Sequence, residues 1–186
     1  MEQLIEKAAV LIGALPYIQE FRNSVVVVKF GGSAMEDVAC TRGVIRDIVF
    51  MECAGMKPVI VHGGGKAISA KLKEAGIPTR FINGLRYTCD RTIKVVDEVL
   101  HKQVNASLVG MMTELNGKAS TVSGKDVLRA ERVTTTDAET GKELDLGNVG
   151  RVVNVDTEQL NQMLGRGEVP VITPLGTGAD GRVYNI

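Results

Sequence analysis

The most informative segment of this 186-residue sequence reads Val25-Val26-Val27-Val28-Lys29-Phe30-Gly31-Gly32-Ser33. Four consecutive β-branched residues predict a strand buried on both faces, which is typical of parallel strands covered by helices. A lysine and two glycines follow. Burying an ammonium group costs free energy unless an anion neutralises it, and glycines let backbone N–H groups approach a ligand closely. The segment therefore predicts a phosphate site that includes Lys29, Gly31 and Gly32.

A second segment repeats this pattern: Pro58-Val59-Ile60-Val61-His62, then Gly63-Gly64-Gly65-Lys66. Helices are expected after both glycine loops, the first beginning at Asp37 and the second ending at Gly76. This order predicts an α/β fold with a parallel sheet and right-handed crossovers. Glycine loops at the carboxyl ends of such strands bind anions at helix N-termini. The two loops are therefore predicted to form two halves of one anion site.

The first 21 residues predict a helix, because apolar residues recur at three- and four-residue steps. These residues are Leu4, Ala8, Leu11, Leu15 and Ile18. Pro16 lies inside the pattern and is expected to kink or interrupt the helix. Two interpretations are open: a helix that lies on the core of its own chain, or an arm whose apolar stripe packs on another subunit.

The later elements are expected to be a long helix capped by Asp90 and ending at Asn116-Gly117, a hairpin formed by residues 127–134 and 150–155, a helix over 156–164 and a strand over 169–175. Residues 176–181 match the dinucleotide motif G-x-G-x-x-G, but no helix pattern follows them, so a turn is expected there. The sequence stops within a predicted strand at Ile186, which is the pattern expected of a cut chain.

The composition argues against several classes of function. Zero formal net charge and 4% aromatic residues argue against a nucleic-acid platform. Three cysteines without metal-ligand spacing favour a reduced, cytoplasmic protein. No apolar run reaches about 18 residues, so no membrane span is expected. With only two histidines and no H-E-x-x-H motif, no protein metal site is predicted.

The two glycine loops, Lys29-Phe30-Gly31-Gly32-Ser33 and His62-Gly63-Gly64-Gly65, resemble those of the amino acid kinases. Members of this family phosphorylate carboxylates, carbamate or nucleoside monophosphates. Within the family, three further stretches are similar to the acetylglutamate kinases: Asn83-Gly84-Leu85-Arg86-Tyr87-Thr88, Val104-Asn105 and Gly124-Lys125-Asp126. The resemblance runs from Val25 onward. It implies a three-layer αβα sandwich around a mainly parallel sheet, the carbamate kinase-like fold, with an N-terminal helical arm.

The resemblance also implies which residues handle phosphate. Lys29 would be the catalytic residue that binds the transferring phosphoryl group, assisted by the N–H groups of Gly31, Gly32, Gly64 and Gly65. The cofactor would be ATP, with Mg²⁺ brought by the nucleotide. The family's second half, which holds the adenine and ribose, has no counterpart in this sequence. The resemblance therefore implies an inactive N-terminal half.

The acceptor substrate implied by the resemblance is N-acetyl-L-glutamate, phosphorylated on its γ-carboxylate in arginine biosynthesis. Arg86 would bind the α-carboxylate of this substrate, and Gly64, Gly65 and Asn185 would also contact it. The resemblance divides the chain into an arm, residues 1–22, and an acetylglutamate-binding domain, residues 23–186. It further implies a homo-oligomer, either a dimer or a hexamer formed through the N-terminal helix, with L-arginine as an inhibitor.

The proposed chemistry agrees with the residue types, because a side-chain carboxylate with a pKa of about 4.3 is already ionised at neutral pH. No general base is needed, and His62 is interpreted as a structural histidine at a strand end. Phosphoryl transfer then depends on placement and charge neutralisation. Two alternatives stay open. One is a kinase for glutamate, aspartate or carbamate, and the other is a non-catalytic binding or oligomerisation module.

Overall fold

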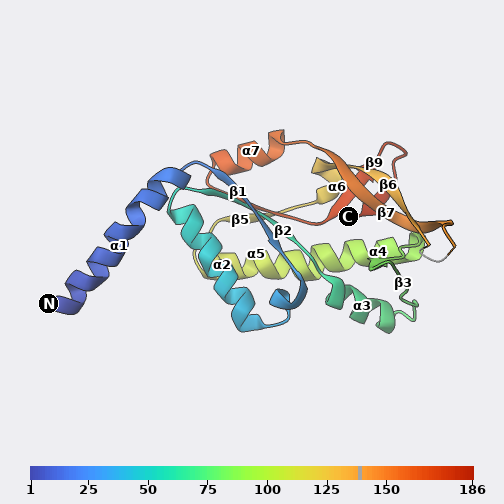
Figure 1. Ribbon diagram of the computed structural model, residues 1–186, viewed down its shortest axis with the longest axis horizontal. Helices are drawn as coiled ribbons and strands as arrows, with labels where there is room; N and C mark the ends of the chain where they lie inside the picture. Colours follow the sequence, from blue (N-terminus) through green and yellow to red (C-terminus); the bar gives the residue numbers. More distant parts are fainter. Residues whose placement is uncertain (138–139) are drawn as a thin grey trace.

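A computed structural model describes residues 1–137 and 140–186 of the chain. Its main sheet has four strands, all parallel, in the order β1-β2-β8-β5 (Figure 1). These strands are β1 (Val25–Phe30), β2 (Lys57–His62), β8 (Val169–Ile172) and β5 (Ala119–Val122). The predicted parallel sheet is confirmed, and β1 and β2 are neighbours in it. Both glycine loops therefore begin at the same end of the sheet, where the carboxyl ends of β1 and β2 lie side by side.

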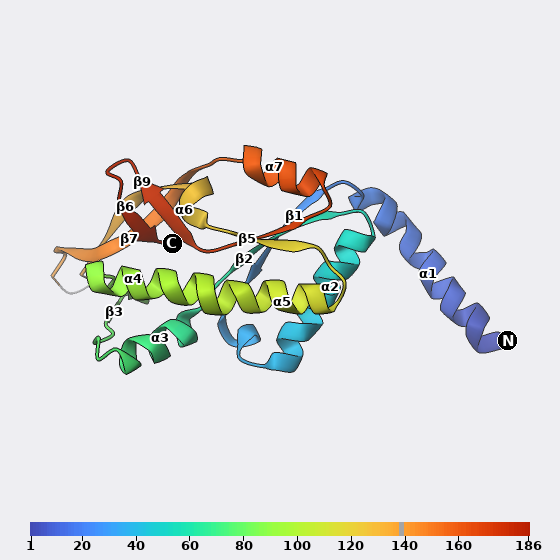
Figure 2. The same ribbon diagram turned by 180° about the vertical axis from the view of Figure 1, so that it is seen from behind.

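Helices cover this sheet on two sides and form the predicted three layers (Figures 1 and 2). One side carries α2 (Val38–Cys53), α3 (Gly65–Glu74) and a long helical segment, composed of α4 (Asp90–Val99), the π-helical η2 (Leu100–Asn105) and α5 (Ala106–Glu114). The other side carries α7 (Glu158–Gly165). Because strand side chains alternate between faces, Ile60 packs in the larger core under α2 to α5, and Val59 packs in the smaller core under α7.

The helix boundaries agree with the sequence signals at most positions. Asp37 caps α2 as expected, since its carboxylate accepts the N–H of Cys40 at 2.9 Å. Asp90 is not a cap: Cys89 occupies the capping position, and Asp90 is the first residue of α4. Its carboxylate accepts a hydrogen bond from the side-chain amide of Asn148 instead. The aspartate therefore ties α4 to the second sheet rather than to its own first turn.

The prediction that Val25 to Val28 are buried on both faces is wrong, since Val26 and Val28 are only half-buried and the other two valines are exposed. Val25 is 54% exposed and Val27 is 64% exposed. The physical reason is the position of β1, which is an edge strand paired only with β2. On the face that Val25 and Val27 share, α7 packs over the inner strands, and its core includes no residue of β1. A run of valines identifies a strand but not how much of it the rest of the chain covers.

A second sheet was only partly predicted. The expected hairpin is present as the antiparallel pair β6 (Leu128–Thr136) and β7 (Glu143–Val155), and its connection includes residues 138–139, outside the described part of the chain. The strand expected over 169–175 is divided, because Thr173 and Pro174 separate β8 from β9 (Leu175–Gly178). With β10 (Val183–Asn185), these strands close on themselves in the order β10-β7-β6-β9. Strands β9 and β10 are antiparallel, so the glycine motif at 176–181 leads into a turn, as expected.

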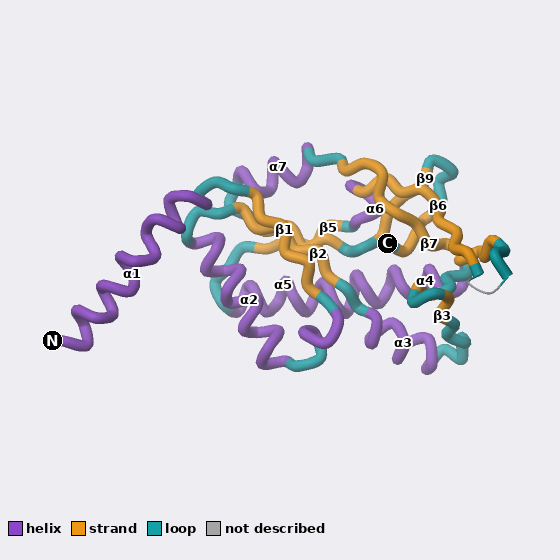
Figure 3. The backbone as a smooth tube through the Cα atoms, in the orientation of Figure 1, coloured by secondary structure: helices purple, strands orange, loops and turns teal. Residues whose placement is uncertain are grey.

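The first helix, α1 (Glu2–Phe21), extends away from the body of the molecule (Figure 3). It runs unbroken through Pro16, so the alternative of an interruption there is excluded. None of its residues is buried, and its apolar side chains face solvent. The interpretation that this helix lies on the core of its own chain is therefore wrong. No helix within the described residues is long and apolar enough to cross a membrane.

Candidate functional site

The two glycine loops meet at the carboxyl ends of β1 and β2. The N–H of Gly63 donates to the carbonyl oxygen of Phe30 at 2.8 Å. A Cβ atom added at Gly31 would lie only 3.2 Å from the nitrogen of Gly63. A side chain at Gly31 would therefore crowd the backbone of the second loop. The structure brings together the two loops that the sequence predicts as halves of one site.

The second loop opens α3, with Gly64 at the capping position and Gly65 as the first helical residue. The N–H groups of a first helical turn have no acceptor within the helix and carry the positive end of the helix dipole. A Cβ at Gly64 would lie 2.7 Å from Cδ2 of Leu100, so a side chain here would displace Leu100 of η2. A helix N-terminus held in this way provides a place for an anion.

Lys29 is the second-last residue of β1, paired with Val61 of β2 immediately before the glycine loops. Its side chain is exposed, and no carboxylate in the described part of the chain forms an ion pair with it. The prediction of a buried ammonium is therefore wrong, for the same reason that Val25 and Val27 are exposed. Lys29 nevertheless adds an unneutralised positive charge beside the loops.

Arg86 is placed by a small hairpin, β3 (Phe81–Ile82) and β4 (Leu85–Arg86). Its turn is formed by Asn83 and Gly84, which have φ angles of +49° and +79°. Positive φ at both central positions is typical of the tight turns that join antiparallel strands. The side-chain amide of Asn83 also donates to Thr135 at 2.9 Å, which ties the hairpin to β6. The hairpin thus spans the space between α3 and the second sheet.

The guanidinium of Arg86 is only 8% exposed and lies against the second glycine loop. Nη2 donates to the carbonyl oxygen of Gly65 at 3.1 Å and to Oγ of Ser69 at 2.7 Å. The ring of Phe81 lies 4.8 Å from Cζ on another side. Nη1 is buried and has no hydrogen-bond partner among the described residues. Burial lowers the pKa of Arg86, because desolvation disfavours the charged form.

This environment leaves Arg86 with one free donor group and no carboxylate partner in the described part of the chain. A buried cation is stable only when an anion neutralises its charge or several acceptors form hydrogen bonds with it. Arginine suits a carboxylate, because its planar fork donates two parallel hydrogen bonds. Ser69, which holds the guanidinium, was not identified from the sequence. Its spacing of four residues from Gly65 along a helix was the available signal, since such residues share a face.

Asn185 lies in β10, where it pairs with Val149 of β7 and Leu175 of β9. It is therefore positioned by the second sheet and not by the glycine loops. The same strand β7 reaches the Arg86 segment, because the N–H of Thr88 donates to the carbonyl oxygen of Leu146 at 3.0 Å. The structure thus brings the β10 and hairpin segments to one side of the molecule without a hydrogen bond between Asn185 and Arg86 among the described contacts.

A cavity of about 430 Å³ touches both glycine loops through Gly32, Gly64 and Gly65. An ion pair between Lys66 and Glu36 also borders it. Its remaining wall includes the apolar residues Met35, Val38, Ala67, Val104, Leu108 and Met111 and the polar residues Thr41, Gln103 and Ser107. Neither Arg86 nor Asn185 lines it. The cavity therefore borders the glycine loops but not the two other residues that the family resemblance assigns to the acceptor. Among the described residues, no group of three or more histidine, cysteine, aspartate or glutamate side chains is arranged to hold a metal ion.

Comparisons with known proteins identify relatives of this chain. The sequence profile of the "Amino acid kinase family" matches residues 24–186. The acetylglutamate kinase of Caldanaerobacter subterraneus subsp. tengcongensis is 45% identical over 184 residues, covering 98% of this chain and 59% of that protein. The acetylglutamate kinase of Carboxydothermus hydrogenoformans is 43% identical over 190 residues, covering 100% of this chain and 65% of that protein. The chain thus spans about three fifths of the length of these curated relatives.

Solved structures share the fold. N-acetylglutamate synthase from Neisseria gonorrhoeae, in complex with coenzyme A and N-acetyl-glutamate, aligns with a TM-score of 0.78 at 21% identity and covers 96% of this chain and 40% of that chain. The smu.665 protein of Streptococcus mutans aligns with a TM-score of 0.74 at 28% identity, covering 87% of this chain and 63% of that chain. The three-layer arrangement implied by the family resemblance is therefore accompanied by overall fold similarity to solved structures.

Proposed function

Because this chain belongs to the amino acid kinase family, we propose that it is the acceptor-binding part of an acetylglutamate kinase. The whole enzyme would use ATP to phosphorylate the γ-carboxylate of N-acetyl-L-glutamate and form N-acetylglutamyl 5-phosphate in arginine biosynthesis, in the cytoplasm. The chain alone would bind the acceptor but would not turn over, since the nucleotide-binding part of the family lies in its second half.

The main observation in support of this proposal is the environment of the Arg86 side chain. A nearly buried guanidinium, held by Gly65 and Ser69 and with Nη1 unpartnered, requires an anionic ligand at the glycine loop. A substrate with two carboxylates suits the arrangement, because one can bind Arg86 while the other faces the phosphate site. Asn185 on β10 would contact the remainder of the substrate.

In the proposed reaction these residues supply placement and charge rather than a base. The γ-carboxylate is ionised at neutral pH and attacks directly. Lys29 and the N–H groups of Gly31, Gly32, Gly64 and Gly65 would neutralise charge on the phosphoryl oxygens as they pass between donor and acceptor. An exposed lysine and the first turn of α3 fit the phosphate end of ATP. Mg²⁺ bound to the nucleotide would add further charge neutralisation there.

The exposed face of β1 is consistent with a nucleotide-binding part in the whole kinase. Val25, Val27 and Lys29 lie on the same face of an edge strand, and no helix of the described chain covers them. Exposed β-branched residues on an unpaired strand edge are unusual in a finished domain. We propose that the nucleotide-binding part packs there and so brings ATP next to Lys29.

The same family relationship supports self-assembly and feedback. We propose a homo-oligomer, a dimer or a hexamer formed through α1, with L-arginine as an inhibitor. The exposed apolar side chains of α1 support the first point, since they have no partner within the described chain. This observation also favours a second candidate function, a non-catalytic oligomerisation module, in which α1 would be the working element.

Thermal unfolding of the chain with candidate acceptors tests the proposed substrate. At a concentration about 100 times its Kd, N-acetyl-L-glutamate should stabilise the fold by about 2.7 kcal/mol and raise Tm by several degrees. Glutamate, aspartate and carbamoyl phosphate should raise Tm much less. An equal shift with glutamate would favour a different amino acid kinase. No shift with any acceptor would leave the oligomerisation module as the better assignment.

Turnover is tested separately with ATP, Mg²⁺ and acetylglutamate in a coupled assay for ADP release. The chain should give no rate above background. Robust turnover would show that the residues described above suffice for catalysis and would refute the proposal that the chain is inactive.

A further inference from the structure

A network of buried polar groups joins the second glycine loop to the long helix. The ring of His62 is 2% exposed, and the side chain of Asn105 is fully buried. Nδ1 of His62 lies 2.8 Å from the carbonyl oxygen of Gly63, and Nε2 lies 3.1 Å from Nδ2 of Asn105. The same Nδ2 donates to the carbonyl oxygen of Val171 at 2.7 Å. Strand β2, the loop, η2 and β8 are thus linked through two side chains.

The partners of these groups fix where the protons lie. A backbone carbonyl can only accept, so the side-chain NH₂ of Asn105 must face Val171. That NH₂ also faces Nε2 of His62, so Nε2 must be the unprotonated, accepting nitrogen. Nδ1 then carries the proton and donates it to the carbonyl oxygen of Gly63. This arrangement satisfies both ring nitrogens of a neutral imidazole, and a second proton on the ring would face the donor of Asn105.

The π-helical turn explains how a polar side chain reaches this position. Segment η2 runs from Leu100 to Asn105 between two α-helices, and a π-turn adds a residue to the helical repeat. Val104 and Asn105, which are consecutive, are both buried as a result. Val104 contributes to the apolar core, while Asn105 reaches the end of β2. Such turns are frequent at functional sites.

We propose that His62, held by Asn105 as the neutral tautomer with the proton on Nδ1, is a positioning residue that fixes the carbonyl of Gly63 and thereby directs the N–H groups of Gly64 and Gly65 toward the phosphate. The identity of the bound phosphate rests on the proposed function. The tautomer and the loop geometry do not, because they are properties of the free chain.

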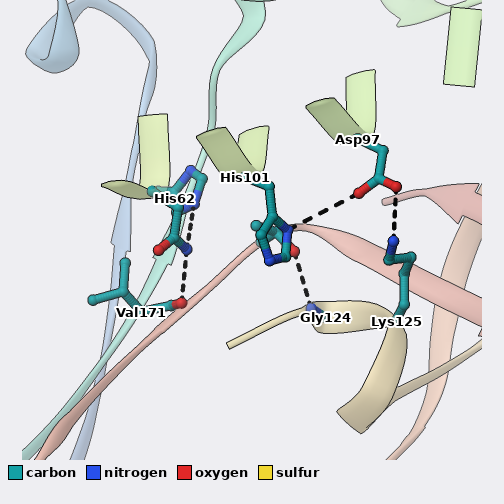
Figure 4. A network of polar contacts seen from close by, with 8 residues as sticks. His62, Asp97, His101, Gly124, Lys125 and Val171 are labelled. Carbon is teal, nitrogen blue, oxygen red and sulfur yellow. Dashed lines mark hydrogen bonds and ion pairs between the residues drawn. The ribbon is translucent and has the colours of Figure 1, made fainter. Parts of the chain in front are cut away.

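The charged groups around His62 favour its neutral form. His101, on the same π-helical turn as Asn105, acts on His62 electrostatically, because two positive rings would repel each other. Nδ1 of His101 lies 4.0 Å from the carboxylate of Asp97, which is itself paired with Lys125 of the short helix α6 (Gly124–Val127) at 2.7 Å (Figure 4). No carboxylate among the described residues contacts the His62 ring. Burial together with His101 accordingly lowers the pKa of His62 from its ordinary value of 6.5.

Nuclear magnetic resonance on the whole chain with ¹⁵N-labelled histidine tests the tautomer directly. The sequence contains two histidines, so His101→Gln assigns the signals of the remaining ring. His62 should show a protonated Nδ1 and a bare Nε2 at neutral pH, and its pKa should lie below the ordinary value of 6.5. A proton on Nε2, or titration near 6.5, would overturn the proposal without reference to any ligand.

The positioning role is tested with Asn105→Leu, which removes the donor to His62 at similar volume. The tautomer preference should be lost, the amide signals of Gly63, Gly64 and Gly65 should shift, and the Kd for acetylglutamate should rise about tenfold, the effect of one lost hydrogen bond at the upper end of its usual range.

Thr173→Val is the matched control, because it breaks another buried hydrogen bond at the end of β8, from the N–H of Gly124 at 2.9 Å. It should leave the glycine amides and the tautomer unchanged. Unshifted glycine amides in Asn105→Leu would overturn the proposal. If the wild-type chain binds no acetylglutamate while the tautomer and the amide shifts are as expected, the proposed function fails and the positioning role stands.

Discussion

At the scale of single residues, Arg86 shows how a fold holds a charge almost entirely out of water. Gly65 and Ser69 accept two hydrogen bonds from its Nη2, and the ring of Phe81 lies over Cζ. Nη1 has no hydrogen-bond partner among the described residues. Lysine could not reproduce this arrangement, since an ammonium is a compact charge without a planar fork. The residue is thus fitted to a ligand by its shape as well as by its charge.

We expect Arg86→Lys to raise the Kd for acetylglutamate at least tenfold, because a two-bond contact with a carboxylate is reduced to one. Isothermal calorimetry on the chain measures the affinity. Arg91→Lys is the control. Arg91 is exposed in the first turn of α4, so this variant should bind acetylglutamate as the wild type does. An unchanged affinity in Arg86→Lys would remove this arginine from the site.

His62 gives the fold a defined pH dependence. Its pKa is lowered in the folded chain, mainly by burial, so the unfolded chain binds more protons over the interval between the folded pKa and about 6.5. The free energy of unfolding should therefore keep its full value above about pH 6.5 and should decrease as the pH is lowered through that interval. Urea unfolding at several pH values measures this loss. The loss of stability at low pH should be smaller in His62→Gln than in the wild type and should still occur in His101→Gln. An equal loss in the wild type and both variants would contradict the assignment of this pH dependence to His62.

At the scale of elements, the contact between the second glycine loop and η2 depends on the absence of a side chain. A Cβ at Gly64 would lie 2.7 Å from Leu100 and 3.3 Å from Val104. Leu100 is completely buried, so its end methyl group has no free space into which to move. At Gly65, one residue later, nothing lies within 4 Å of such an atom. Of these two adjacent glycines, only Gly64 is therefore restricted by packing against η2.

Substituting each glycine by alanine separates these reasons. Gly64→Ala should lower the free energy of unfolding by about 1–3 kcal/mol through overpacking. Gly65→Ala should change it by no more than about 1 kcal/mol, and in the stabilising direction, because alanine is the better helix former. Chemical denaturation of the two variants measures both values. A Gly64→Ala variant as stable as the wild type would show that η2 yields to the loop.

At the scale of the whole molecule, α1 and the rest of the chain form two parts of different character. The body has two cores on opposite faces of its main sheet, whereas α1 extends into solvent with no buried residue (Figure 2). Most helical stability in proteins comes from the packing of an apolar face, and α1 has no such packing within the described chain. We therefore expect the proposed self-assembly to add packing contacts that α1 lacks within the described chain.

Deleting residues 1–22 should lower the mass of the particle in solution, as measured by analytical ultracentrifugation, while the body keeps its unfolding transition. Leu11→Asp should have a similar effect, because it places a charge in the apolar stripe. Gln3→Asp, a change at another exposed position of the same helix, should not. If the deleted protein assembles as the full chain does, α1 is only a surface helix.

Local patterns in the sequence determined a large part of this structure. Valine runs, capping signals and glycine loops located β1, β2, α2 and α3, because β-branched residues, caps and positive φ angles act over a few neighbouring residues. The order of these elements determined the parallel sheet, since right-handed crossovers leave few alternatives. The joining of the two glycine loops followed from that order alone.

Tertiary structure decided what depends on distant partners. Whether Val25 and Val27 are covered depends on where α7 packs, and the closing of β10 onto β7 depends on strands more than thirty residues apart. Asn105 faces inward because the helix makes a π-turn, which no apolar period predicts. Arg86 is a buried cation because the tertiary structure places its hairpin against α3. Burial and pairing are properties of surfaces that long loops bring together, and for that reason the sequence pattern alone does not contain them.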